Sequence, residues 1–199
     1  MDLTLLAIFV VTFASVLILP GPNAAFSVAQ SLKYGFLKSI YVPLGFMSAT
    51  GIHAILVFSG LGVLVQEYAF LLVVLKWTGV AYLLFLAFKA FTSQPSDVGH
   101  SPLVASKFKM YQSALLVSLT NPKAFLASLL IYPLFVSDEG SYLFQALVLT
   151  VLAMAISFTV YSMYGLLSSV FKDKLAGSSL ANKIVGGLYV GAAGVLAGK

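Results

Sequence analysis

Two proline-containing motifs place polar groups inside long apolar stretches. They read Pro20-Gly21-Pro22-Asn23 and Asn121-Pro122-Lys123. Proline in a helix interior removes a backbone donor and clashes with the preceding turn, so each motif predicts a helix that stops and restarts. The restarted helix offers N–H groups to a carboxylate, and the helix that stopped offers carbonyl groups to an ammonium. A zwitterion such as an amino acid fits both, which makes these seven residues candidates for substrate binding.

Two ionisable side chains inside the apolar stretches, Lys123 and His53, are candidates for proton coupling. A lysine near the centre of a bilayer costs about 3 kcal/mol on insertion scales, so Lys123 is expected to pair with a substrate carboxylate or to exchange protons. Alternatively, it only stabilises the unwound turn from a polar cavity. His53 has an ordinary pKa that suits proton exchange, but it would serve equally as a hydrogen-bond partner for a neighbouring helix. The sequence leaves these alternatives open.

The composition indicates that both motifs lie in a membrane. Of the 199 residues, 60% are hydrophobic and only 9% are charged, and the mean hydropathy is +1.03. Soluble domains carry roughly 25% charged residues. The chain has no cysteine, which excludes disulfides and thiolate metal sites. The net charge of +5 is too small and scattered to indicate nucleic-acid binding, and we expect no cofactor and no metal.

Six apolar stretches are long enough to cross the hydrocarbon core as helices. They are Leu3–Leu32, Ser39–Gln66, Phe70–Phe91, Met110–Ser137, Tyr142–Phe171 and Ile184–Gly198, the last of which is short and could begin a turn earlier. The proline motifs fall near the middle of the first and fourth stretches. We therefore predict an all-α integral membrane protein with six transmembrane helices, of which spans 1 and 4 are broken. Irregular backbone at that depth requires a protein or water-filled surrounding.

The two halves of the chain resemble each other weakly. Residues 1–91 and 110–199 flank a polar linker at 92–109, and together they form one predicted transporter domain over 1–199. Each half has a proline motif in its first span and the pattern K-x-x-G-x-x-Y in its third, starting at Lys76 and Lys183. Because each half holds three spans, the halves must be inverted relative to each other, which is a recurrent transporter design. The alternative is two ordinary three-helix units with coincidental prolines.

The connections between the predicted spans alternate in charge. Lysines mark the first, third and fifth connections, and acids mark the second and fourth. Lysine-bearing loops stay in the cytoplasm, which predicts that both termini lie outside. Lys76 and Lys199 run against this pattern. The residues used are Lys33, Lys38, Glu67, Lys89, Lys107, Lys109, Asp138, Glu139, Lys172, Lys174 and Lys183.

Residues throughout the chain resemble the LysE/RhtB family of amino-acid exporters. The matching parts are Pro20–Asn23, Ser31–Gly35, Leu44-Gly45, His53, Gly60-Leu61, Lys76, Gly79, Ala81–Leu83, Lys89, Thr120–Ala124, Pro133, Phe135 and Val136. The resemblance implies efflux of amino acids or close derivatives across the bacterial cytoplasmic (inner) membrane. It also implies that proton antiport drives this export.

Three other functions compete with amino-acid export. Export of another small solute, such as a lactone or an ion, is the nearest alternative. An intramembrane enzyme would need a catalytic cluster, and one histidine without an acid inside a span is a poor one. A membrane scaffold would not explain two helix breaks at similar depth. Gly187-x-x-x-Gly191 resembles a helix-packing motif, which would serve a homodimer or packing within one chain.

Overall fold

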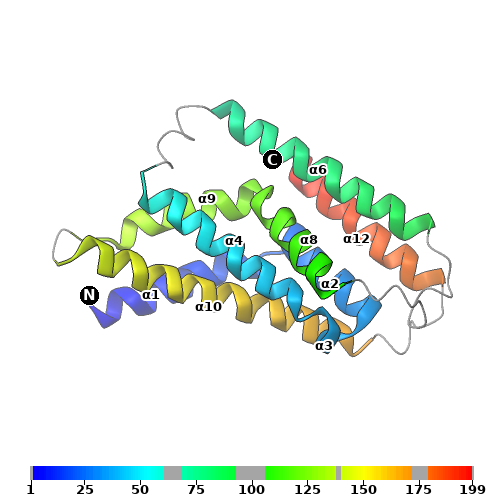
Figure 1. Ribbon diagram of the computed structural model, residues 1–199, viewed down its shortest axis with the longest axis horizontal. Coiled ribbons are helices and arrows are strands. Elements are labelled where there is room, and N and C mark those ends of the chain that lie inside the picture. The colour runs from blue at the N-terminus through cyan, green and yellow to red at the C-terminus, as the bar shows by residue number, and fades with distance from the viewer. Residues whose placement is uncertain (1, 61–68, 93–105, 138–139, 172–178, 199) are drawn as a thin grey trace.

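The computed structural model describes residues 2–60, 69–92, 106–137, 140–171 and 179–198, and the regular structure of these residues is helical (Figure 1). This confirms the predicted all-α class for the described part of the chain. The elements are α1 (Leu3–Ile18), α2 (Pro22–Tyr34), α3 (Phe36–Ser39), α4 (Tyr41–Phe58), α6 (Ala69–Thr92), α8 (Lys107–Leu119), α9 (Pro122–Ile131), the 3-10 helix η1 (Tyr132–Phe135), α10 (Tyr142–Ser169) and α12 (Ser179–Ala197).

Both proline motifs interrupt a helix, as the sequence predicts. The first separates α1 from α2, whose axes differ by 66°, and the second separates α8 from α9 and η1, where the bend is 62°. Pro22 and Pro122 each occupy the first turn of the restarted helix. Proline suits this position because its missing N–H would have no partner within the helix there.

The described residues contain two to four candidate membrane spans. Phe36–Phe58 and Tyr142–Ser169 are each long and apolar enough to cross a bilayer. Each bent pair also qualifies when its two parts are taken together as one span. Asn182–Ala197 is a shorter apolar helix.

The end of α4 corrects one predicted boundary. The second span was predicted to run to Gln66, but the helix ends at Phe58. Ser59 and Gly60 close it with N–H bonds to the carbonyl groups of Ile55 and Val57, and Gly60 has a φ of +81°. A glycine in this left-handed conformation is a common way to end a helix. The apolar residues that follow misled the prediction because hydropathy does not record such a stop.

Several residues used to predict orientation lie outside the described part of the chain. They are Glu67, Asp138, Glu139, Lys172, Lys174 and Lys199, together with residues 93–105 of the polar linker.

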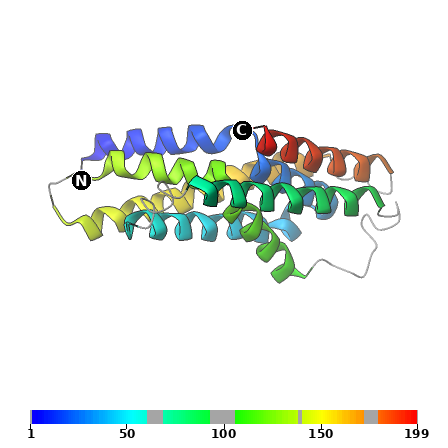
Figure 2. The same cartoon turned by 90° about the horizontal axis from the view of Figure 1, so that it is seen from above.

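The two halves of the chain interlock in an elongated bundle (Figures 1 and 2). Helix α4 packs on α8 and α10, and α10 also covers α1 and α2. Helix α1 contacts α9, whereas α2 contacts α8 and α12. Helix α6 packs along α12 at one side of the bundle. Each half therefore buries its apolar faces mainly against the other half.

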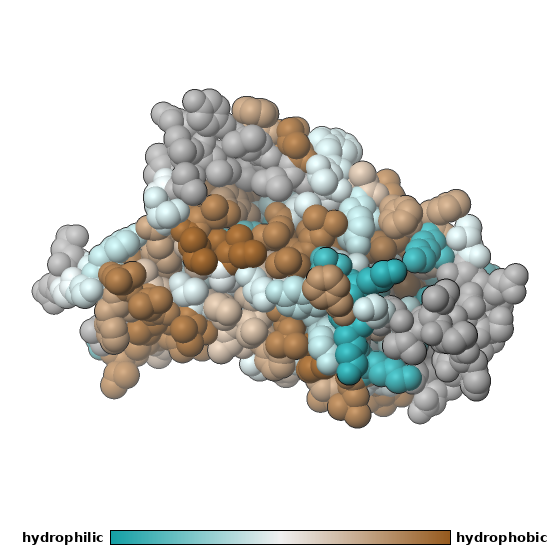
Figure 3. Space-filling model, viewed as in Figure 1, coloured by the Kyte–Doolittle hydropathy of each residue, from teal (hydrophilic) through white to brown (hydrophobic). Residues whose placement is uncertain are grey.

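Aromatic side chains fill the core on both sides of the breaks. On one side, the buried Tyr132 ring of η1 lies 5.7 Å from the Phe13 ring and 5.0 Å from the Phe58 ring, measured between centroids. On the other, Phe46 lies 4.8 Å from Tyr161. Many large apolar side chains remain on the outer surface, where Figure 3 shows broad hydrophobic areas. Such a surface is suited to lipid contact.

The crossing of α4 and α8 depends on a glycine. A Cβ at Gly45 would lie 2.6 Å from the Tyr111 carbonyl oxygen and 2.9 Å from the Ala114 Cβ. We expect Gly45→Ala to destabilise the protein by about 1–3 kcal/mol, the usual cost of overpacking. Thermal unfolding in detergent measures this effect. Gly194→Ala is the matched control because a Cβ there meets no atom within 4 Å. Equal melting temperatures for the two variants would contradict the prediction.

Candidate functional site

A chain of side-chain hydrogen bonds joins the two breaks. The Asn121 amide nitrogen donates to Asn23 Oδ1 at 3.0 Å, and the Asn23 amide nitrogen donates to Ser118 Oγ at 3.0 Å. All three residues are buried. A buried polar group without a hydrogen-bond partner lowers stability. This series of hydrogen bonds therefore holds α2 against the junction of α8 and α9.

The second break satisfies its own backbone. At the end of α8, the N–H groups of Thr120 and Asn121 donate to the carbonyl groups of Leu116 and Ser118. At the start of α9, Asn121 Oδ1 caps the helix by accepting from the Lys123 N–H at 3.1 Å. This differs from the expectation that both restarted helices would offer unbonded N–H groups. The difference arises because Asn121 is itself a strong N-cap residue.

The first break is open by comparison. Gly21 occupies the N-cap position of α2 and has no side chain to cap it. Pro22 has no N–H, and within the described residues the N–H groups of Asn23 and Ala24 receive no hydrogen-bond acceptor. The first backbone bond of α2 runs from the Ala25 N–H to the Gly21 carbonyl at 2.9 Å. The start of α2 is therefore the available end for an anion.

The end of α1 is bonded by side chains from the second half of the chain. Lys123 Nζ donates to the Leu19 carbonyl at 2.6 Å, and the Tyr164 hydroxyl donates to the Ile18 carbonyl. Ile18 and Leu19 are 55% and 58% exposed as whole residues, so this end of α1 is not enclosed by the described helices. The lysine side chain also passes close to Gly21, where a Cβ would be 3.7 Å from Nζ.

Equivalent positions of the two motifs have different roles. Gly21 and Asn121 are the N-cap residues, and Asn23 and Lys123 each follow the first-turn proline. One motif therefore has an uncapped helix start, and the other supplies the cap and the cation. Together the motifs bring an uncapped helix start, a helix end with carbonyl groups and the Lys123 cation close to one another.

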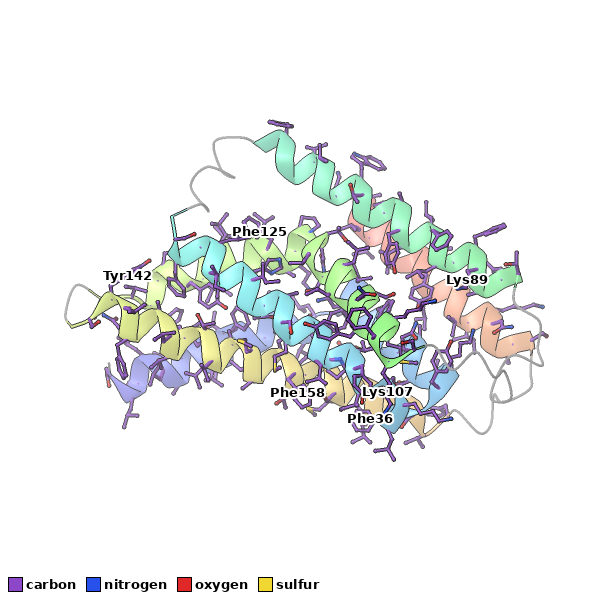
Figure 4. The ribbon with its side chains drawn as sticks, in the orientation of Figure 1. Phe36, Lys89, Lys107, Phe125, Tyr142 and Phe158 are labelled. Atoms are coloured by element: carbon purple, nitrogen blue, oxygen red, sulfur yellow. The ribbon has the colours of Figure 1, made fainter. Side chains whose placement is uncertain are left out.

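The structure gathers most of the predicted site residues. Gly21, Asn23, Asn121 and Lys123 are linked by the contacts above, while the prolines shape the backbone: Pro22 is buried and Pro20 is exposed. His53 lies on α4, buried to 2% exposure, with its ring 5.5 Å from that of Phe125. Phe125, labelled in Figure 4, belongs to the first turns of α9. His53 thus approaches the second break through an aromatic neighbour.

Three contributors were missed by the sequence analysis. Ser118 and Tyr164 donate or accept in this network, and Tyr161 lies within reach of Asn23. The pair Tyr161 and Tyr164 had a usable signal, because two tyrosines three residues apart share a face of a helix. Their position in the middle of an apolar stretch set them apart from interfacial tyrosines.

Comparison with known proteins identifies the family. The sequence matches the LysE type translocator family over residues 14–199. The chain belongs to this family. It is 27% identical over 175 residues to the homoserine/homoserine lactone efflux protein of Salmonella typhimurium, an alignment covering 86% of this chain and 85% of the relative. It is 28% identical over 203 residues to the leucine efflux protein of an Enterobacter species, covering 95% and 93%.

The LysE-type assignment extends over nearly the whole chain. An uncharacterized membrane protein of Vibrio cholerae is 25% identical over 201 residues, covering 99% of this chain and 98% of the relative. No solved structure matches the chain. This LysE-type translocator is a membrane transporter and not an enzyme, which removes the intramembrane-enzyme alternative.

The Asn121 side chain should contribute measurably to the free energy of unfolding of this LysE-type translocator. Asn121→Ala removes the cap of α9 and the bond to Asn23, and we expect it to lower the free energy of unfolding by about 1–3 kcal/mol. Asn121→Ser restores the cap but is too short to keep the bond to Asn23, so its stability should be intermediate. Chemical denaturation of the purified proteins in detergent checks this order. A stability of Asn121→Ala equal to that of the wild type would contradict the assigned role.

Proposed function

We propose that the protein exports amino acids or close derivatives from the bacterial cytoplasm. The observation that carries this proposal is the uncapped start of α2 beside the Lys123 ammonium. Such a pairing of unbonded N–H groups with a cation suits a carboxylate. The related proteins are named for efflux of leucine and of homoserine, which carry a carboxylate, and one name also includes homoserine lactone, which carries an ammonium but no carboxylate.

A zwitterion matches both ends of the first break. Its carboxylate would bind the N–H groups of Asn23 and Ala24 together with Lys123. Its ammonium would bind the Leu19 carbonyl, because the partial negative charge at the end of α1 favours a cation. The predicted substrate-binding residues therefore remain Pro20, Gly21, Pro22, Asn23, Asn121, Pro122 and Lys123, with the prolines and Gly21 acting through the backbone.

The proposed architecture is one domain of six spans in two inverted repeats, over residues 1–91 and 110–199. Three pairings support it: α1 lies beside α9, α2 beside α8, and α6 beside α12. Under an inverted two-fold relation, the first part of one broken span should meet the second part of the other. The substrate site would then lie where the repeats meet.

The proposed location is the bacterial inner membrane, with both termini outside. Lys89, near the end of α6, and Lys107, at the start of α8, lie toward the same end of the bundle in Figure 4. Figure 3 shows the hydrophilic side chains of this face concentrated at the same end. Lysine-rich ends face the cytoplasm by the positive-inside rule.

Proton antiport is the proposed driving mechanism, with His53 and Lys123 as candidate proton carriers. His53 Nε2 is buried and has no hydrogen-bond partner among the described residues. A buried imidazole nitrogen without a partner is costly, which favours a role that brings it one. A homodimer through Gly187 and Gly191 remains a prediction; a Cβ at either glycine would meet no atom within 4 Å.

The proposed function is tested by efflux from cells preloaded with dipeptides. Expression of the wild-type chain should selectively raise the release of one or a few amino acids relative to an empty vector. Lys123→Ala and Asn23→Ala should each abolish that excess, because each removes a group proposed to bind the substrate. Lys38→Ala, which alters an exposed lysine of α3, is the matched control. Normal efflux by both site variants at wild-type membrane levels would contradict the proposed site.

The uncapped state of α2 has its own test. Gly21→Asn would place a capping side chain where Asn121 stands in the other motif, and the Gly21 φ of −179° is open to any residue. We expect this variant to lose most efflux because the new side chain competes with the substrate for the N–H groups. Gly21→Ala adds a Cβ without a cap and should retain a larger share. Equal efflux rates for the two variants, measured at equal membrane levels, would contradict an anion site at this helix start.

A further inference from the structure

The contact between Lys123 and Leu19 bridges the two breaks. Lys123 is the second residue of α9. Its Nζ lies 2.6 Å from the carbonyl oxygen of Leu19, at the end of α1 before the first break. The residues are 104 positions apart in the chain. The neighbouring Ile18 carbonyl accepts from Tyr164 of α10 instead. Among the described residues, Lys123 is therefore the charged side chain that donates to the end of α1.

The electrostatic setting of Lys123 explains why it makes this contact. A cation at the start of a helix lies against the positive end of the helix dipole, which is its unfavourable end. The end of α1 carries the opposite partial charge. Donation to the Leu19 carbonyl thus moves the ammonium away from α9 and toward α1. Leu19 as a whole residue is 58% exposed, so the described residues leave one side of this break uncovered. Displacement requires that a solute reach the carbonyl oxygen from that side.

A lysine ammonium and the α-ammonium of an amino acid are the same kind of group. Each carries one positive charge and three N–H donors. Both would bind the Leu19 carbonyl in the same way and cannot both hold the position of shortest contact. We propose that Lys123 occupies the ammonium subsite of the empty transporter and that the ammonium of the substrate displaces it. This inference rests on the proposed function and identifies the substrate ammonium as the group that replaces Lys123 at the Leu19 carbonyl.

Displacement places Lys123 next to the carboxylate of the same substrate. The side chain already passes Gly21, whose missing Cβ leaves room at the start of α2. A short movement of Nζ from the α1 end toward the α2 end would pair it with a carboxylate held there. The direct lysine bridge between the halves is then replaced by a bridge through the substrate. Lys123 acts as a specificity-determining residue because it competes with ammonium groups and attracts carboxylates.

This exchange predicts a change of specificity when the lysine is removed. Lys123→Met loses the partner of the carboxylate but also removes the competitor for the Leu19 carbonyl. Ligands with both groups should bind about 10- to 100-fold more weakly, the usual effect of losing a hydrogen bond to a charged group. Ligands with an ammonium but no carboxylate should bind at least as tightly as they bind the wild type.

Two pairs of probes separate these effects. Leucine and leucinamide share an ammonium and a side chain but differ in the carboxylate, as do homoserine and homoserine lactone. Isothermal titration of purified protein in nanodiscs should show that Lys123→Met weakens the binding of leucine and homoserine. The binding of leucinamide and of the lactone should stay the same or become tighter. Lys123→Arg should retain the wild-type preference for the acids, and Lys38→Met is the control that should change nothing.

The outcomes distinguish this inference from the proposed function. Suppose that the wild type exports an amino acid, but Lys123→Met weakens the binding of both ligands of each pair equally or of neither ligand. The exchange is then overturned and the export proposal stands. If the wild type exports no amino acid and binds none of the four probes, the proposed function falls and the exchange falls with it. Melting temperatures verify folding, and Lys123→Gln serves the same comparison if the methionine variant does not fold.

Discussion

The site depends on the hydrogen bond between the Asn121 and Asn23 side chains. In apolar surroundings, each interrupted helix leaves N–H and carbonyl groups that need partners. Asn121 meets one of these needs with its oxygen, which caps α9, and its amide nitrogen donates to the Asn23 side chain. Asn23 in turn holds Ser118. This arrangement fixes the two breaks against each other, and the positions of Lys123 and the start of α2 follow from it.

The two proline motifs differ in the residue at the N-cap position of the helix that restarts. A motif with asparagine at the N-cap position closes its own backbone, whereas a motif with glycine there leaves the backbone open. If both breaks were open, several polar groups would be buried without partners. If both were closed, nothing would remain for a ligand. The second break is closed by its own cap, and the first break leaves backbone groups for the proposed substrate.

Close packing supports this site from the surrounding helices. A Cβ at Gly79 of α6 would lie 2.8 Å from the Thr120 carbonyl oxygen at the second break. Gly165 of α10 meets α2 in a similar way, with its notional Cβ 2.7 Å from Ser31 Oγ. Small residues allow such close backbone approach where lipid supplies no hydrophobic driving force between helices. Helix α6 of the first half is thereby held against the second break, and α10 of the second half against the later part of α2.

The sequence by itself determined the helical class, the two breaks and the family. Proline restricts the backbone wherever it stands, and hydropathy reports the membrane directly, so both signals are local. The cap of α9 is a local contact within its own motif, but tertiary structure decided that Lys123 contacts Leu19, because these two residues come from different halves of the chain. It also placed the Tyr164 hydroxyl against the Ile18 carbonyl and ended α4 at Phe58. Such contacts depend on how distant segments pack, and a linear pattern does not record that geometry.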